Sequence, residues 1–231
     1  MPKTTLSSYL REHADSGQKK KDSGPYLTIS RQHGCDGLEL GQLLAEKLNR
    51  RDEQQRWKVY FKEFIQQLSE DTGVAEELLE RERVSKPSLF KDFLRGLHKN
   101  PIPDRIEIRK QIGLMMRIVA INGYSIIIGQ GGAAAVGDLA NGLTLRIEAP
   151  KEWRIARVCR LESVDRHTAA AMIDRYEQEQ LRLRKYYGQQ HKRKPEFHLT
   201  FDNSIFTKEI IADLVIKAME EKNMIEKSAQ K

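Results

Sequence analysis

The strongest constraint on the fold is a run of β-forming residues that leads, through a glycine-punctuated loop, into an amphipathic helix. Residues 26–30 are mostly apolar or β-branched, and Gly34, Gly37 and Gly41 follow them. Leucines then recur every four residues over 40–48, the spacing of one helical face. A strand, a glycine loop and a helix in this order predict the first unit of an α/β domain.

Strands and helices continue to alternate along the chain. Three consecutive isoleucines at 126–128 have the continuous apolar character of a strand that is covered on both faces. This alternation predicts a three-layer α/β fold with a mostly parallel sheet. Further strands are predicted at 57–61, 124–129, 143–147 and 197–201, and helices at 64–97 (two or three, broken at Pro87), 104–122, 152–187 and 207–222.

The glycine loop occupies a position where proteins bind anions. N–H groups in the first turn of a helix have no partner within that helix, and the positive end of the helix dipole lies beside them. Glycine also lets the main chain approach a phosphate closely. The loop is therefore a candidate phosphate cradle, with an ordinary strand-to-helix turn as the alternative.

The charge balance agrees with an anionic ligand. Lys and Arg number 40 against 33 Asp and Glu, which gives a net charge of +7. The basic residues are scattered among acids with little aromatic interleaving, unlike a nucleic-acid surface. Two cysteines provide no disulfide framework, and Arg117 and Asn122 interrupt the most apolar stretch, 112–128. We expect a cytoplasmic protein with nucleotide substrates, no nucleic-acid or membrane partner, and no particular oligomeric state.

Three arginines recur at intervals of three residues in the predicted helix of 152–187. Arg154, Arg157 and Arg160 would share one broad helical face. Guanidinium groups arranged in this way can grip phosphates bidentately. The alternative is a solvated basic face.

Six groups of residues, spaced along the chain, form a recognisable set. They are Thr28-Ile29-Ser30-Arg31-Gln32-His33-Gly34 with Leu40-Gly41 and Leu44-Ala45-Glu46-Lys47-Leu48; Tyr60-Phe61-Lys62-Glu63-Phe64-Ile65; Ile126-Ile127-Ile128-Gly129-Gln130-Gly131; Ala149-Pro150-Lys151-Glu152-Trp153-Arg154; Lys185-Tyr186-Tyr187; and Phe201-Asp202-Asn203. Together they resemble the cytidylate kinase-like family, a branch of the P-loop nucleoside monophosphate kinases, over residues 26–219.

The resemblance implies a P-loop NTPase-type domain over residues 25–231, after a flexible leader at 1–24. Within that domain it implies a helical acceptor-binding insertion at 62–122 and an arginine-rich lid at 151–194. The implied activity is ATP-dependent phosphoryl transfer, with Mg²⁺, to a nucleoside monophosphate such as cytidylate or to another small acceptor.

The resemblance also implies roles for individual side chains. The ATP-binding residues would be His33, Gly34, Cys35, Asp36, Gly37, Leu38 and Glu39; the catalytic residues would be Arg31, Arg154, Arg157 and Arg160; the acceptor-binding residues would be Lys62, Arg105, Arg109 and Gln130; and Glu39 would also bind the metal.

The loop departs from the family pattern in its charges. The motif G-x-x-x-x-G-K-[ST] has no counterpart, because no lysine is present in either possible register. Leu38 and Gln130 are neutral where many family members carry a basic residue, and Asp36 adds a negative charge where phosphates would lie. Arg31, at the start of the loop, is the candidate replacement cation, with a surface ion pair as its alternative role.

Two other functions fit parts of the sequence. The missing lysine is also expected of a nucleotide or phospholigand sensor that kept a kinase fold without its chemistry. A dinucleotide-binding oxidoreductase is the second alternative, because residues 129–134 satisfy G-x-G-x-x-A and Glu148 follows the next predicted strand.

Overall fold

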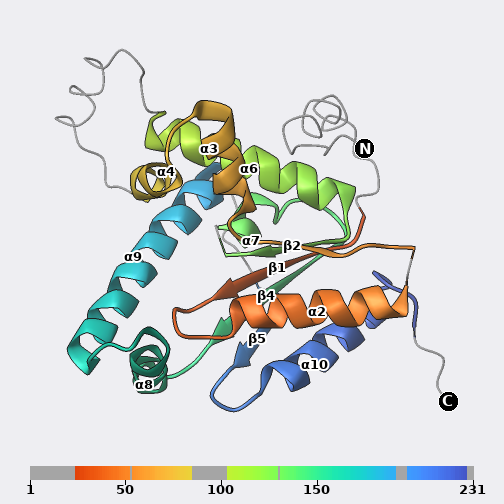
Figure 1. The fold of residues 1–231 in the computed structure, drawn as a ribbon. Coiled ribbons are helices and arrows are strands. Elements are labelled where there is room, and N and C mark those ends of the chain that lie inside the picture. The colour runs from red at the N-terminus through yellow and green to blue at the C-terminus, as the bar shows by residue number, and fades with distance from the viewer. Residues whose placement is uncertain (1–23, 53, 85–102, 130, 191–196, 228–231) are drawn as a thin grey trace.

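One five-stranded sheet forms the centre of the molecule (Figure 1). The computed structural model describes residues 24–52, 54–84, 103–129, 131–190 and 197–227. The strands lie in the order β2-β3-β1-β4-β5, and all four pairings between neighbours are parallel, which confirms the predicted architecture. The strands are β1 (Tyr26–Arg31), β2 (Lys58–Tyr60), β3 (Ser125–Ile128), β4 (Gly142–Glu148) and β5 (Leu199–Asp202).

Helices cover both faces of this sheet and make three layers. The helices α2 (Gly37–Arg51) and α10 (Lys208–Glu221) pack side by side on one face, over a core that includes Leu27 and Leu145 (Figure 1). The helices α6 (Arg105–Asn122) and α7 (Gly132–Ala135) belong to the core on the other face, which contains Ile127. Parallel strands buried on both faces require apolar side chains on each, as the isoleucine run predicts.

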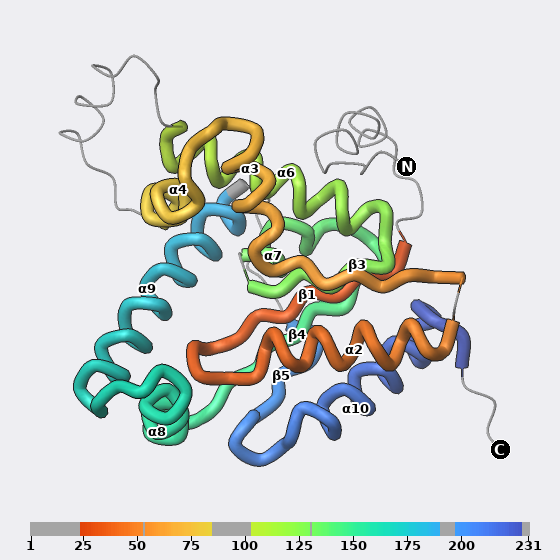
Figure 2. Tube along the Cα trace, in the orientation of Figure 1, coloured from red at the N-terminus to blue at the C-terminus, as the bar shows by residue number. Residues whose placement is uncertain are grey.

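Two pairs of helices extend beyond the three layers at the edge where the strands end. The first pair, α3 (Glu63–Thr72) and α4 (Glu76–Arg83), follows β2 and packs against α6. The second pair, α8 (Lys151–Glu162) and α9 (Arg166–Gln190), forms an arm whose longer helix runs from beside α8 to α4 and α6 (Figure 2). Loops that follow parallel strands meet at this edge, which is where α/β proteins bind ligands.

The arm differs from the single helical stretch predicted over 152–187. Ser163 adopts a left-handed conformation with φ 55°, which ends α8 and turns the chain into α9. The sequence gives no glycine or proline at this position to signal the turn.

Two parts of the sequence predictions lie outside the described residues. They are the predicted leader up to residue 23 and the end of the helical stretch predicted at 64–97, from residue 85 onward, including Pro87. In the described part of the chain, no helix has both the length and the apolar character to cross a membrane.

Candidate functional site

The predicted phosphate cradle is a tight loop between β1 and α2. The N–H group of Asp36 donates to the Asn203 side-chain oxygen at 2.8 Å, and the N–H group of Cys35 donates to the Gln32 carbonyl at 3.2 Å. Asn203 follows β5, so the end of a distant strand holds the loop in shape. Two of the N–H groups that the sequence assigns to a phosphate are therefore hydrogen-bonded within the protein.

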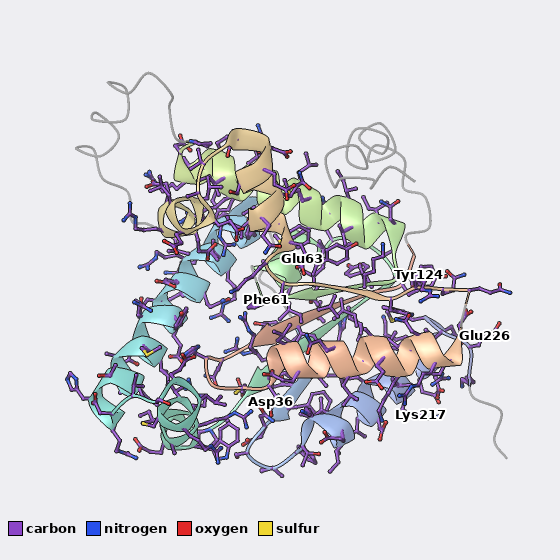
Figure 3. The ribbon with its side chains drawn as sticks, viewed as in Figure 1. Asp36, Phe61, Glu63, Tyr124, Lys217 and Glu226 are labelled. Atoms are coloured by element: carbon purple, nitrogen blue, oxygen red, sulfur yellow. The ribbon has the colours of Figure 1, made fainter. Side chains whose placement is uncertain are left out.

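The Asp36 side chain is held by two partners. Arg157, on α8, forms an ion pair with one carboxylate oxygen, and Asn203 donates to the other at 3.3 Å. The Arg157 guanidinium also lies over the Trp153 ring, 5.3 Å from its centroid. Asp36 stands at the start of α2 (Figure 3), where a carboxylate is stabilised by the helix dipole. The protein thus supplies its own anion at the helix terminus.

Arg154 ties the arm to the same loop from inside the fold. Arg154 is 3% exposed, and its guanidinium donates to the carbonyls of Ala149 at 2.9 Å and His33 at 3.4 Å and pairs with Glu177 of α9 at 2.8 Å. The Gln32 side chain donates to the same carboxylate at 3.5 Å. Because all its strong partners are protein groups, Arg154 fixes the loop against α8 and α9.

An aromatic contact reinforces this attachment. The His33 ring stacks on Tyr176 of α9, with centroids 4.2 Å apart. Burial holds the pKa of His33 below its ordinary value, and the nearby Arg31 and Arg154 charges lower that pKa further. The imidazole in this stack is therefore neutral at pH 7.

Two further loop residues have clear structural requirements. Gly34 has φ 92°, and a Cβ there would lie 3.2 Å from the Arg154 side chain, so glycine allows the loop to touch α8. Burial raises the pKa of the Cys35 thiol to about 11. Cys35 is therefore a neutral thiol at physiological pH.

Arg31 lies on the other side of the loop, at the end of β1. Its side chain runs so close to Gly37 and Gly129 that a Cβ on Gly129 would lie 1.9 Å from the Arg31 Nη1 atom. The guanidinium lies 5.2 Å from the centroid of the Phe61 ring. Burial lowers the pKa of Arg31 and the positive charge of Arg83 lowers it further. Two glycines thus make room for a fixed cation at the edge of the sheet.

A cavity of about 360 Å³ opens beside Arg31, between α3, α4 and α9. Arg83, 3% exposed, lines it and forms a two-contact ion pair with Glu80, at 2.9 and 2.6 Å. The remaining nitrogen of that guanidinium, Nη1, is buried and has no hydrogen-bond partner in the described structure. The cavity's charged lining consists of three cations, Arg31, Lys62 and Arg83, and four carboxylates, Glu76, Glu77, Glu80 and Glu179, joined by the rings of Phe61 and Tyr176.

Glu179 is the one carboxylate that α9 contributes to the cavity lining. Its side chain is 21% exposed and lies 4.0 Å from Arg175, a weak ion pair. Burial raises the pKa of Glu179 above its ordinary value, while Arg175 and Arg182 act in the opposite direction. This carboxyl group has no short ion pair among the described residues.

The structure brings together only some of the residues that the sequence singles out. Lys62 lines the cavity beside Arg31, whereas Arg105 and Arg109 do not. Arg109 is buried and donates to the Arg83 carbonyl at 2.7 Å, a structural contact. Arg160 and Glu39 are exposed, Leu38 packs against the α2 core, and Gln130 lies outside the described residues. No group of three or more His, Cys, Asp or Glu side chains in the described chain is arranged to hold a metal ion.

The glycines of the dinucleotide-binding alternative face other parts of the fold. A Cβ on Gly131 would lie 2.6 Å from the Tyr187 ring, and one on Gly132 would lie 2.9 Å from Ile127. The helix that follows, α7, spans only Gly132–Ala135. These glycines serve close packing within the protein.

A solved structure supports this fold. An uncharacterized protein from Eubacterium ventriosum ATCC 27560 is 16% identical, with a TM-score of 0.60 over 86% of this chain and 99% of that chain. Two shikimate kinases align with TM-scores of 0.46: one from Bacteroides thetaiotaomicron, 14% identical over 87% of this chain and 99% of its own, and one from Acinetobacter baumannii in complex with shikimate, 11% identical over 88% and 97%.

A search of curated proteins finds no match. The model of the cytidylate kinase-like family, in contrast, matches residues 26–205, which include the sheet, the β1–α2 loop and both pairs of outer helices. The resemblance carried by the six groups of residues is thereby confirmed. This chain belongs to the cytidylate kinase-like family.

Proposed function

We propose that the protein is a phosphotransferase that moves a phosphoryl group from ATP to a small acceptor. The donor triphosphate would lie over the β1–α2 loop, and the acceptor would lie in the cavity between α4 and α9. One observation carries the proposal: the Arg31 guanidinium is fixed at the boundary between the loop and the cavity. A cation there would stabilise the charge on a phosphoryl group in transit.

The loop and its surroundings fit a triphosphate in one specific respect. Gly37 and Gly129 leave room for Arg31, so a guanidinium replaces the lysine that the loop lacks. We propose that loop residues 33–39 hold ATP together with the N-terminal end of α2. Mg²⁺ would supply neutralisation of the phosphate charge when bound, and we propose that Glu39, in the first turn of α2, would hold it.

We propose that the arm acts as the lid over residues 151–194, with Arg154, Arg157 and Arg160 on it. Arg157 is the lid arginine with the most direct access to the donor, because it already binds an anion, Asp36. The helices at 62–122 would form the acceptor-binding insertion, with Lys62 at the cavity. Nucleoside monophosphates such as cytidylate are the first acceptor class to test.

A nucleotide sensor is the second candidate, because one observation favours it. The Asp36 carboxylate and the engaged Asp36 N–H group occupy part of the cradle with the protein's own hydrogen bonds. A protein that binds a nucleotide weakly and transfers nothing would tolerate this arrangement. In either case we propose a cytoplasmic protein with nucleotide ligands.

Two measurements on the purified chain separate these functions. Titration calorimetry with ATP and Mg²⁺ measures binding, and transfer of labelled γ-phosphate to a panel of nucleoside monophosphates and small alcohols measures activity. The phosphotransferase predicts binding and transfer to at least one acceptor. Binding without transfer supports the sensor, and the absence of binding contradicts both. A preference for NAD(H) would restore the oxidoreductase alternative.

A further inference from the structure

Asp36 lies at the N-terminal boundary of α2, but its carboxylate does not cap the helix. An aspartate at this position ordinarily accepts a hydrogen bond from an N–H group of the first helical turn, and the Asp36 side chain makes no such bond. One of its carboxylate oxygens instead pairs with Arg157 of α8, and the other accepts from the Asn203 amide at 3.3 Å. The carboxylate thus joins the loop to the arm and leaves the helix terminus without a side-chain cap.

Arg157 is the arginine of the proposed lid that lies beside the loop with no carbonyl partner among the described residues. Arg154 is engaged by two carbonyls and Glu177, and Arg160 is exposed. In the described part of the chain, Arg157 has one ion-pair partner, Asp36. The arginine that a donor phosphate would use first is therefore the one that Asp36 already holds.

A carboxylate and a phosphate compete for the same guanidinium. Both present paired anionic oxygens, which accept two parallel hydrogen bonds from an arginine. The Arg157 and Asp36 side chains are 21% and 14% exposed, so water screens their attraction only in part. A phosphate beside α2 would also lie near the negative charge of Asp36. The free protein therefore holds the loop in a state that opposes the binding of a polyphosphate.

We propose that the Asp36–Arg157 contact is an autoinhibitory ion pair, in which the carboxylate takes the place of a donor phosphate until ATP displaces it. The inference rests on the proposed phosphotransferase function and concerns the regulation of its donor site. In the free protein the ion pair ties α8 to the β1–α2 loop. When a triphosphate binds, Arg157 exchanges the carboxylate for phosphate oxygens, and Asp36 keeps Asn203 as its partner.

Such a pair lowers the apparent affinity for ATP. Only molecules in which Arg157 has left Asp36 bind the donor fully, so the apparent Kd equals the intrinsic Kd divided by the fraction of those molecules. If the ion pair is closed in about nine molecules of ten, the Kd is about ten times larger than it would be without the pair. The contact therefore raises the ATP concentration at which the donor site fills.

The experiment measures the affinity of the full chain for a non-hydrolysable ATP analogue with Mg²⁺, by titration calorimetry. Asp36→Asn keeps the size of the side chain and removes its charge, and should lower the Kd by about 10-fold. Asp36→Gly, which leaves no side chain to hold Arg157, should change the Kd in the same direction. Asp213→Asn is the matched control, because Asp213 of α10 forms a 2.5 Å ion pair with Lys47 of α2, outside the loop and the arm. Its Kd should equal that of the parent chain.

A double variant separates an autoinhibitory pair from a cation that only neutralises Asp36. Arg157→Ala is made in the parent chain and in Asp36→Asn. The autoinhibitory pair predicts that Arg157→Ala raises the Kd more in Asp36→Asn, by about 10-fold, because only there is Arg157 free beforehand. If Arg157 only neutralises Asp36, its removal raises the Kd more in the parent chain.

The outcomes distinguish this inference from the function on which it rests. An equal or weaker affinity in Asp36→Asn, or the reverse order of the two Arg157→Ala effects, would overturn the inference and leave the phosphotransferase intact. Failure of both the parent chain and Asp36→Asn to bind the analogue would overturn the proposed function, and this inference with it.

Discussion

The β1–α2 loop and the cavity lie on opposite sides of Arg31. They differ in how many of their polar groups are hydrogen-bonded or ion-paired within the protein. On the side of the loop, Asp36 has Arg157 and Asn203 as partners, and Arg154 is fully engaged by carbonyls and Glu177. On the side of the cavity, and among the residues that the structure describes, the Nη1 atom of Arg83 is buried without a hydrogen-bond partner, and the ion pair of Glu179 with Arg175 spans 4.0 Å. The loop is therefore held by paired polar groups, whereas the cavity contains polar groups that the described protein leaves unpaired or weakly paired.

The contrast also separates two ways of providing a site. A fully paired region supplies a fixed frame, since opening it means breaking several hydrogen bonds together. An unpaired buried group raises the free energy of the folded protein, and weakly paired charges that line a cavity, such as Glu179, are available to a ligand. Arg31 belongs to both regions, because its stem lies against the loop glycine and its guanidinium reaches the cavity.

The largest effect is expected from Arg31→Ala. Removing a fixed cation from the path of a transferring phosphoryl group should lower kcat/KM for ATP-dependent transfer by about 10³-fold. Arg50→Ala is the control, because Arg50 is an exposed arginine of α2 whose partner, Glu46, lies on the same helix. Both variants are measured in the labelled-phosphate assay. Equal activity in the two variants would show that Arg31 has only a structural role.

The second effect concerns the lid. Arg157→Ala should lower turnover by about 10²-fold, because the variant loses a guanidinium that can leave Asp36 for a phosphate. The free energy of unfolding should fall by about 1–3 kcal/mol, since the Arg157 and Asp36 side chains are only 21% and 14% exposed and the carboxylate keeps Asn203 as a partner. Denaturant titration and steady-state kinetics measure the two quantities. If Arg157→Ala is much less stable than the parent chain but keeps its turnover, Arg157 has a structural role and is not a lid residue.

Asn203→Ala tests the rigidity of the loop. The change removes the acceptor for the Asp36 N–H group and one donor to its carboxylate, and should lower the free energy of unfolding by about 1–3 kcal/mol. Gln178→Ala, at an exposed position on α9, is the control for denaturant unfolding. If both variants unfold at the same denaturant concentration, Asn203 does not hold the loop.

The smallest effect is a pH dependence of stability that comes from His33. The folded state holds the pKa of His33 below its unfolded value, so the unfolded chain binds the proton more readily. The free energy of unfolding should therefore fall as the pH drops below about 6.5, the ordinary value for histidine. His33→Gln should reduce this fall. An unchanged pH profile in the variant would mean that other groups cause it.

Most of the architecture could be predicted from the sequence because its signals are local. Apolar runs and helical spacing identify all five strands and three helices of the three layers, α2, α6 and α10. The turn at Ser163 could not be predicted, since the arginine-rich pattern continues on both sides of a residue that rarely adopts a left-handed conformation. Its conformation depends on how α8 and α9 pack together.

Fewer residues of the candidate site can be predicted from the sequence, for a physical reason. Arg31 could be singled out by its place at the end of a strand before a glycine loop. Arg83 and Glu179, in contrast, lie in charged helices where most side chains face solvent. Only the packing of α4 and α9 around one cavity brings them together. The Phe201-Asp202-Asn203 motif contains the residue that clamps the loop, but its partner, Asp36, is visible only in the folded structure.

The most direct test of the central claim is a crystal structure of the chain with a non-hydrolysable ATP analogue and Mg²⁺. The account predicts a triphosphate at the start of α2 with its terminal phosphates within hydrogen-bonding distance of the Arg31 guanidinium. Density for the nucleotide elsewhere, or at the loop with Arg31 still turned toward Phe61 and in contact with no phosphate, would contradict it.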